Sequence, residues 1–434
     1  MEAEEYLNRI PMWASKKNSL EAIRDFLGEL GDPDDSMKLI HVAGTNGKGS
    51  VCAYLTSVLR AAGYRTGTFI SPHLVYTRER FLIDGRPVEA PAFEKAFLRV
   101  KTLADRMTAE GYEPPTYFEF LFYMFLVICQ EKAPDFVILE TGMGGLLDTT
   151  NVIRNPLLTV ITSISMDHMQ YLGHTVEDIA AQKAGILKRH VPVVCDCSCP
   201  QSTQVVRAAA ERLDCPWYPV GEKDYRFLGR SHGFAEISVE TPWGARPIRV
   251  FSEADYQMNN GAVAVFGAEI LNQTGAADIT PDQIRRGMEE SRWPGRMEEV
   301  LPGIYVDGAH NGGGMEALTR TVRRMVLESR RSVSLMFGVV SDKEYHRMIE
   351  ELCRDLPISR VTIAHMATER SADTGELAEI FRREIGCPVE VFDTVREAWD
   401  HFLSCRGDGL AFCAGSLYLV GEIKEILAAQ GGRT

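Results

Sequence analysis

A glycine-rich loop between a short apolar strand and a helix is the feature that most constrains the fold of this chain. Residues 38–42 (KLIHV) favour a buried strand, residues 44–50 (GTNGKGS) form the loop, and the apolar spacing over residues 50–62 predicts a helix. Glycines let backbone N–H groups close around phosphate oxygens, and a helix N-terminus adds favourable partial charge. This local order predicts an α/β domain with a site for nucleotide phosphates.

The loop also carries side chains suited to phosphate chemistry. Lys48 would neutralise the β- and γ-phosphates of a nucleotide, and the Ser50 hydroxyl would ligate Mg²⁺. The spacing departs from the common P-loop, which has a glycine where Val42 stands. The alternative is a glycine turn without a ligand, but Gly-Lys-Gly-Ser in this context favours a nucleotide. The loop residues predicted to bind ATP are Asn46, Gly47, Lys48, Gly49 and Ser50.

The alternation of strands and helices continues along the chain. The expected strands cover residues 66–70, 135–140 and 157–164, and the expected helices cover residues 91–110, 116–132 and the segment that Thr175 caps. Such alternation favours a mostly parallel sheet with both faces covered. Residues 225–250 differ, because a polar turn between two extended runs predicts an antiparallel hairpin. A long helix is expected to follow, from residue 256 to about residue 271.

A helix-breaking segment divides the chain. Residues 291–296 (SRWPGR) contain Pro-Gly, and strand–helix alternation restarts directly afterwards. We therefore expect an α/β protein with two domains. Residues 1–292 would form a P-loop-type, mostly parallel sheet domain with a small antiparallel element, and residues 297–434 a smaller Rossmann-like domain. The cleft between two such domains is a natural ligand site.

Several polar residues follow predicted strands. Glu140 ends an apolar strand beside the P-loop strand, where a carboxylate can hold Mg²⁺, although alone it would read as a solvated strand end. His168 follows the next strand, but magnesium prefers oxygen ligands and a lone histidine is more often structural. Lys183 lies within a helical pattern, which indicates an ordinary solvated lysine. In the second domain, residues 307–311 (DGAHN) end the first strand, and Arg296 just before them could reach nucleotide phosphates.

Charge and hydropathy exclude other classes of protein. The net charge of −13 argues against nucleic acid as the main partner. The N-terminal residues 1–13 are acidic and lack the apolar core of a signal peptide. The most apolar run, residues 120–128, is too short to span a bilayer and is expected to be a buried helix. We therefore expect a cytoplasmic protein without a membrane partner, whose ten cysteines are mostly free thiols.

Three of those cysteines alternate along the chain. Cys195, Cys197 and Cys199 occur in VVCDCSCP, for which a metal site is conceivable. Their spacing matches no common zinc pattern, so a strand that runs into a loop is the simpler interpretation.

Taken together, the motifs resemble those of folylpolyglutamate synthases and dihydrofolate synthases, which belong to the Mur ligase superfamily. In the family's order, the matching segments are HVAGTNGKGS, SPHL, ETGMGGLLDTTN, DHMQYLG, QKAGI, WPGRME, DGAHN and AGSLYLVG. The resemblance covers nearly the whole chain, from about Asn18 to Gly421. Two positions depart from the usual pattern, because Leu146 stands where arginine is common and Ala414 where threonine is usual.

The resemblance implies roles for the matching positions. A magnesium site, for two ions, is implied at Ser50, Ser71, Glu140, His168 and Lys183. Nucleotide contacts are implied at Asn260, Arg296 and Asp307. Contacts to the organic substrates are implied at Thr116, Tyr117, Phe118, Glu119, Asp148 and Ser416. Lys48, Lys183 and His310 are assigned to catalysis.

Lys183 matches the lysine that is carbamylated in this superfamily. Carbamylation would turn a cation into an anionic oxygen ligand, which magnesium prefers. The reaction needs a neutral amine, so burial and nearby cations should depress the lysine pKa.

The implied activity is ATP-dependent joining of a carboxylate to an amine. ATP would phosphorylate the γ-carboxylate of a folate glutamate, or the benzoate of dihydropteroate, and the amine of L-glutamate would then displace phosphate. The expected partners are these small molecules, and we expect a monomer. One alternative is a Mur-type peptidoglycan ligase, but the roughly 40 residues before the loop are too few for that enzyme's extra domain. Another is a nucleotide-binding regulatory P-loop protein without ligase activity.

Overall fold

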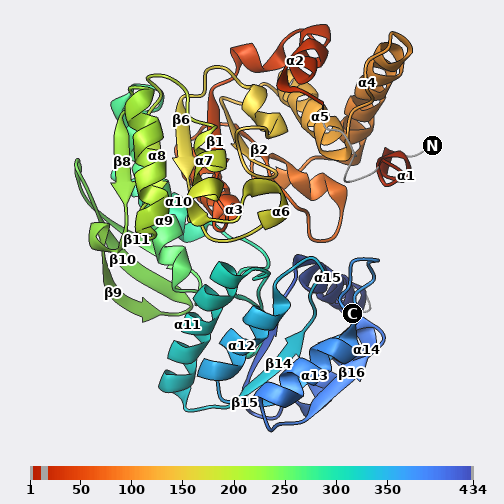
Figure 1. Cartoon of the computed structure of the whole chain (residues 1–434). Helices are drawn as coiled ribbons and strands as arrows, with labels where there is room; N and C mark the ends of the chain where they lie inside the picture. Colours follow the sequence, from red (N-terminus) through yellow and green to blue (C-terminus); the bar gives the residue numbers. More distant parts are fainter. Residues whose placement is uncertain (1–2, 11–17, 432–434) are drawn as a thin grey trace. The chain divides into compact units, whose positions relative to one another are not determined.

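Residues 3–10 and 18–431 are described by a computed structural model of the chain (Figure 1). They divide into two units. The first unit consists of the chain up to Ser231 together with Ala235–Phe251 and Asn259–Ser291. The second consists of His232–Phe234, Ser252–Met258 and the chain from Arg292 onward. Each unit is built around its own sheet.

The sheet of the first unit has eight strands in the order β4-β3-β2-β5-β1-β6-β7-β8. Their bounds are β1 Leu39–Ala43, β2 Thr66–Phe69, β3 Phe81–Ile83, β4 Arg86–Pro87, β5 Phe136–Glu140, β6 Leu158–Ile161, β7 Val193–Asp196 and β8 Trp217–Val220. Neighbouring strands pair in parallel along the part of the sheet with the order β2-β5-β1-β6-β7-β8. Strands β3 and β4 form an antiparallel edge beside β2. The expected mostly parallel sheet is confirmed, with the P-loop strand β1 at its centre.

Helices of the first unit connect these strands (Figure 1). Their bounds are α1 Ala3–Leu7, α2 Leu20–Glu29, α3 Lys48–Ala61, α4 Ala90–Ala109, α5 Tyr117–Lys132, α6 Met169–Leu172, α7 Val176–Ala184, α8 Pro200–Arg212 and α10 Pro281–Glu290. Helix α9 (Tyr256–Gln273) begins in the second unit and continues into the first. The most apolar run of the sequence lies within α5, which is buried along most of its length, as expected. Among the described residues, no helix is both long and apolar enough to cross a membrane.

Aromatic side chains pack α5 against the sheet. Phe69 on β2 lies 5.2 Å from Phe125 of α5 and 5.9 Å from Phe81 on β3, measured between ring centroids. Such rings remove large apolar areas from water, which stabilises the unit by about 25 cal/mol per Å² buried. This packing supports the strands whose carboxyl ends carry the site.

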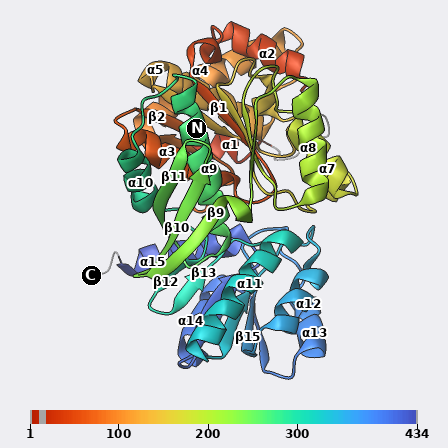
Figure 2. The same cartoon turned by 90° about the vertical axis from the view of Figure 1, so that its left-hand side faces the viewer.

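The antiparallel element is larger than the sequence predicts. Residues 225–251 form three strands, β9 Tyr225–Ser231, β10 Phe234–Thr241 and β11 Gly244–Phe251, rather than one hairpin. Figure 2 shows these strands side by side in the order β11-β10-β9. The prediction missed the second turn, in which Gly244 adopts a φ of 114° that favours glycine. The third strand pairs with β10 and packs on α10.

The second unit has a six-stranded sheet in the order β12-β13-β17-β14-β15-β16. The strands are β12 Glu298–Leu301, β13 Ile304–Val306, β14 Val333–Phe337, β15 Ile358–Ala364, β16 Val389–Phe392 and β17 Leu410–Ala414. The helices are α11 Gly312–Ser329, α12 Tyr345–Asp355, α13 Thr374–Glu384, α14 Val395–Cys405 and α15 Leu417–Gly431. All strands pair in parallel except β12, an antiparallel edge that the sequence did not predict. The expected α/β alternation of this half is confirmed.

Candidate functional site

The phosphate loop joins β1 to α3 at the centre of the first sheet. Gly47 caps α3 with a φ of 90°, and a Cβ added there would lie 2.4 Å from the Asn260 side-chain oxygen. A Cβ on Gly44 would lie 1.8 Å from the Thr162 hydroxyl. Both contacts are too close for any side chain, so only glycine fits at these positions. The loop backbone is therefore held closely against α9 and the segment after β6.

Lys48 and Glu140 meet beside this loop. Register places Val42 of β1 opposite Glu140 of β5, so the carboxylate emerges next to the loop. The Lys48 ammonium lies 3.9 Å from a Glu140 oxygen and donates to the Thr45 carbonyl at 3.2 Å. The Ser71 backbone N–H donates to the other Glu140 oxygen at 3.1 Å. Of the residues predicted to hold magnesium, Ser71 and Glu140 are thus in contact.

Lys183 is not the solvated mid-helix lysine that residue reasoning indicated. It is the penultimate residue of α7, is only 3% exposed, and donates from Nζ to the Gly44 carbonyl at 2.7 Å. Burial, and after it the nearby Lys48 cation, lower its pKa to about 7, while Asp167 and Asp148 act in the opposite direction. The predicted depression of this pKa is confirmed.

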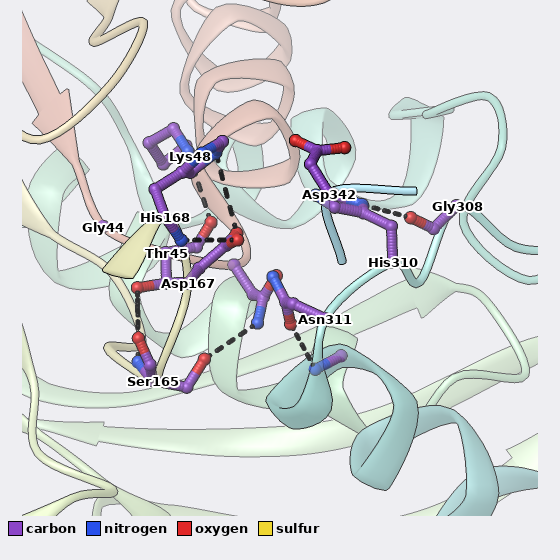
Figure 3. Close-up of polar contacts among 12 residues, drawn as sticks. Gly44, Thr45, Lys48, Ser165, Asp167, His168, Gly308, His310, Asn311 and Asp342 are labelled. Atoms are coloured by element: carbon purple, nitrogen blue, oxygen red, sulfur yellow. Dashed lines mark hydrogen bonds and ion pairs between the residues drawn. The ribbon is translucent and has the colours of Figure 1, made fainter. Parts of the chain in front are cut away.

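His168 lies in the same neighbourhood, at the start of the short helix α6. Its backbone has a φ of 49°, and its Nε2 lies 3.9 Å from an Asp167 oxygen (Figure 3). The Asp167 carboxylate also accepts a hydrogen bond from the His168 backbone at 2.9 Å. Because Asp167 acts electrostatically on Lys183, these three residues share one polar region.

Asp148, assigned to substrate by resemblance, holds its own loop together. Its carboxylate accepts from the Thr150 backbone at 3.0 Å, the Thr150 hydroxyl at 2.5 Å and the Met143 backbone at 2.9 Å. The Thr150 oxygen is also 2.8 Å from His41 Nε2 on β1. Since the hydroxyl proton is donated to Asp148, His41 must donate from Nε2. Burial lowers the His41 pKa to about 3, so the ring is neutral near pH 7.

This loop supports the segment that carries Lys183. The Leu146 N–H donates to the Gln182 carbonyl at 2.7 Å, and the Asn151 side chain donates to the Gly185 carbonyl at 3.1 Å. A Cβ on Gly145 would lie 2.9 Å from the Lys183 carbonyl oxygen. The end of α7 is therefore fixed from one side by the loop after β5.

The segment 116–119, also assigned to substrate, begins α5. Thr116 caps the helix, and the Glu119 carboxylate accepts from the Thr116 backbone at 2.9 Å and from the Asn18 amide at 2.7 Å. The Phe118 ring leaves no room for a side chain on Gly142, where a Cβ would approach it to 2.7 Å. The Arg80 guanidinium lies 5.4 Å from the centroid of the Tyr117 ring. Thr116 and Glu119 thus form a capping box, in which each side chain accepts the backbone N–H of the other residue.

Four further predicted residues lie in the second unit. Asp307, at the end of β13, accepts from the Tyr256 hydroxyl at 2.5 Å, the Met297 backbone at 2.9 Å and the Ala309 backbone at 2.8 Å. Burial raises its pKa, and the Arg296 cation opposes that shift. His310 Nδ1 lies 2.7 Å from the Gly308 carbonyl, which fixes Nδ1 as a protonated donor (Figure 3). The Ser416 hydroxyl accepts from the Tyr418 backbone at 3.1 Å.

The donor set of the first unit suits magnesium. Within residues 3–10 and 18–431, no three His, Cys, Asp or Glu side chains are grouped to hold a metal. The predicted set instead has one carboxylate, Glu140, the hydroxyls of Ser50 and Ser71, and His168. The oxygens of Glu140 and the two serines fit Mg²⁺, His168 would add a nitrogen that Mg²⁺ prefers less, and Lys183 fits only when it has become an anion.

The alternating cysteines do form a strand and a loop. Cys195 lies in β7, Cys197 in the following loop and Cys199 at the start of α8, and all ten cysteines are free thiols. The simpler interpretation of this motif is confirmed.

Several residues that support the phosphate loop and the loop beside it were not predicted from the sequence. Thr45, Ser163 and Ser165 exchange hydrogen bonds across the loop, and His41 and Thr150 anchor the neighbouring loop. Their place in the sequence was the one feature that could have pointed to the serines, because residues 162–166 directly follow β6, the strand beside β1. Serine and threonine at a strand end are too common to single out from sequence.

Comparisons with known proteins place this arrangement among ligases. The Mur ligase middle domain matches residues 92–264, and the Mur ligase glutamate ligase domain matches residues 295–417. The dihydrofolate synthase/folylpolyglutamate synthase of Bacillus subtilis is 37% identical over 77% of this chain and 79% of its own length. The folylpolyglutamate synthase of Lacticaseibacillus casei is 31% identical over 80% of this chain and 81% of its own length. A solved FPGS–AMPPCP–folate complex superposes with a TM-score of 0.86 at 28% identity, over 98% of this chain and 100% of that one.

Proposed function

Because this chain belongs to the folylpolyglutamate synthase and dihydrofolate synthase family of Mur ligases, we propose that it adds L-glutamate to the γ-carboxylate of reduced folates. It is an ATP-dependent ligase that uses ATP and Mg²⁺. A regulatory P-loop protein without ligase activity and a peptidoglycan ligase are both disfavoured by the relatives it matches over most of their length.

One observation carries this function at the level of the site. The phosphate loop, the Lys48 ammonium, the Glu140 carboxylate and the buried Lys183 amine converge at the carboxyl ends of neighbouring parallel strands. Ligands of parallel α/β sheets bind at that edge. The mixture of a cation, a carboxylate and an amine of lowered pKa suits the transfer of a phosphoryl group from ATP.

The chemistry follows from the weakness of a carboxylate as an electrophile. The folate carboxylate attacks the γ-phosphorus of ATP, ADP leaves, and an acyl phosphate forms. The glutamate amine then attacks the acyl carbon, loses a proton, and displaces phosphate. Lys48 and the loop N–H groups are placed to stabilise the negative charge that moves during phosphoryl transfer. Bound Mg²⁺ would neutralise phosphate charge, and Ser50, Ser71 and Glu140 supply oxygens for it.

We further propose that Lys183 is carbamylated. The neutral amine would attack CO₂, form an N–C bond and release one proton, which leaves an anionic carbamate. A pKa of about 7 makes the neutral amine available at physiological pH. The carbamate would replace an ammonium that the Lys48 cation repels with oxygens suited to a second magnesium ion. His168 is the proposed neighbour of that ion, and Asn260, Arg296, Asp307, His310 and Ser416 are proposed to contact nucleotide or glutamate.

The experiment that tests the function measures ATP turnover with each substrate omitted in turn. ADP release should require both a folate and L-glutamate, and mass spectrometry should show a product heavier by one glutamyl residue. Tetrahydrofolate and dihydropteroate are assayed in parallel, because the Bacillus subtilis relative carries both activities in its name. ATP hydrolysis that ignores both substrates would contradict the assignment.

We also propose that the protein is a cytoplasmic monomer and that residues 1–292 and 297–434 act as its functional domains. Ten free thiols suit a reducing compartment. Light scattering at micromolar concentration tests the oligomeric state, for which a mass near 48.4 kDa is expected.

A further inference from the structure

Thr45 connects the phosphate loop to the segment after β6. Its hydroxyl donates to the Ser165 carbonyl at 3.1 Å and accepts from the Ser165 N–H at 3.2 Å. Its backbone N–H donates to the Ser163 carbonyl at 2.8 Å. Figure 3 shows Thr45 and Ser165 with these contacts. One threonine thus makes three hydrogen bonds to Ser163 and Ser165, which lie about 120 positions later in the sequence.

The next residue continues the same connection. The Asn46 carbonyl accepts from the Ser163 hydroxyl at 3.1 Å, and the Asn46 amide donates to the Ser165 hydroxyl at 3.3 Å. Two consecutive residues of the loop are therefore joined to Ser163 and Ser165 through both backbone and side chains. Such a connection fixes the position of one segment relative to the other.

Each segment leads to a different part of the proposed site. On one side, the Thr45 carbonyl accepts from the Lys48 ammonium at 3.2 Å, which sets the side chain aimed at phosphate. On the other, Ser165 lies three residues before His168, a residue that the family resemblance places at the metal. The Thr45 hydroxyl, together with the Asn46 side chain, joins the phosphate loop to the segment that leads to His168.

We propose that Thr45 is a positioning residue that couples magnesium binding to ATP binding. It touches neither ligand in this role, and it acts through Ser165 on one side and Lys48 on the other. The proposal rests on the ATP and magnesium site proposed above. It predicts that loss of the hydroxyl weakens the cooperation between the two ligands more than it weakens either ligand alone.

Valine and serine separate this role from simple packing. Thr45→Val keeps the shape of the side chain but removes both hydrogen bonds to Ser165, whereas Thr45→Ser keeps the hydroxyl and loses a methyl group. Thr45→Ala removes the hydroxyl without a branched replacement, which provides a second test if the valine variant folds poorly. A matched control is Thr159→Val on β6, because the Thr159 hydroxyl also donates to a backbone carbonyl, that of Pro192 at 3.2 Å.

The experiment measures the dissociation constant of a non-hydrolysable ATP analogue by calorimetry, with and without Mg²⁺. The ratio of the two constants reports the coupling between the ligands. In Thr45→Val and Thr45→Ala this ratio should fall by at least about fivefold, the lower range of coupling between two sites. Thr45→Ser should restore the ratio, and Thr159→Val should leave it at the wild-type value even if its melting temperature falls.

Three outcomes would count against these proposals, and they are distinguishable. Equal ratios in wild type, Thr45→Val and Thr45→Ala would overturn the coupling role while leaving the ATP site intact. Failure of the wild-type protein to bind the analogue at all would instead contradict the proposed function. A loss of coupling in Thr159→Val as large as that in Thr45→Val would also overturn the proposal, since the effect would then follow from stability.

Discussion

At the scale of single residues, two lysines share one polar region beside the phosphate loop. Lys48 donates to the Thr45 carbonyl and Lys183 to the Gly44 carbonyl, and the charge of Lys48 lowers the pKa of Lys183. Neighbouring cations of this kind are unfavourable unless an anion joins them. The phosphates of ATP and a carbamate on Lys183 would each supply that negative charge.

Replacing Lys48 tests the first of these roles. Lys48→Ala should reduce ligation below detection while circular dichroism stays unchanged, because the ammonium acts on phosphate charge and contributes little to packing. Lys95→Ala is the control, since Lys95 forms an exposed ion pair with Glu131 on the surface. Near-normal turnover of Lys48→Ala at saturating ATP would refute the assignment.

Replacing Lys183 tests the carbamate. Lys183→Ala should lose activity, and short carboxylic acids added to the assay should restore part of it by occupying the vacated oxygen positions. Lys48→Ala serves as the control that the same acids should not rescue. Wild-type activity in Lys183→Ala would show that no carbamate is needed.

The depressed pKa of Lys183 also predicts a dependence of stability on pH. Between about pH 7 and 10.5 the unfolded lysine keeps its proton and the folded one loses it, so the unfolded state binds more protons. In CO₂-free buffer, stability relative to Lys183→Met should therefore rise with pH over this range, by up to about 1.4 kcal/mol per pH unit. Urea unfolding of both proteins at several pH values measures the difference. A constant difference would indicate that Lys183 titrates normally.

At the scale of elements, some of the residues predicted to bind substrate also cap helices. Asp148 and Glu119 both accept backbone N–H groups where a helix begins. A carboxylate engaged in this way is held in one orientation, which limits what else it can bind. The loops around the site are therefore held in place by these capping hydrogen bonds as well as by any bound ligand.

Glu119 distinguishes capping from substrate binding. Glu119→Gln can still accept from the Thr116 backbone, so we expect a folate KM near that of the wild type. Glu119→Ala should lose about 1 kcal/mol of stability, because partly buried donors of Thr116 and Asn18 lose their acceptor. Steady-state kinetics and denaturant unfolding measure the two effects. A large rise in KM for Glu119→Gln at unchanged stability would favour a direct substrate contact.

At the scale of the whole molecule, the chain enters the second unit for the last time at Arg292, an exposed residue in a segment without helix or strand. The segment after Arg292 contacts a residue proposed to bind nucleotide, because the Met297 backbone N–H donates to the Asp307 carboxylate. Nucleotide bound at Arg296 and Asp307 should therefore order this segment.

Limited proteolysis tests that expectation. Trypsin should cut near residues 291–300, and nucleotide with folate should slow the cut. Cleavage at Arg331, in the exposed loop after α11, is the internal control that ligands should not change. Equal cutting of the first segment with and without ligands would count against ligand-driven ordering there.

The sequence by itself determined the features that depend on neighbours along the chain. Periodicity gave the alternating strands and helices of both units, the strand–loop–helix around Lys48, and the position of Glu140 at the end of β5. The ordered motifs then identified the family. These predictions succeed because secondary structure, turns and caps are set by residues a few positions apart. Strand β11 was not predicted because the turn at Gly244 was missed, and the four-residue strand β12 was not predicted because a short antiparallel edge has a weak local signal.

Only the tertiary structure decided which distant residues share an environment. The burial of Lys183 against the Gly44 carbonyl joins residues 139 apart in sequence, and the His41–Thr150 contact joins residues 109 apart. Both depend on the strand order β5-β1-β6, which periodicity does not encode. A lysine on a helix has the same local pattern whether it faces water or a phosphate loop. The pKa of Lys183, and with it the chemistry available to the site, follows from burial that only the packed sheet creates.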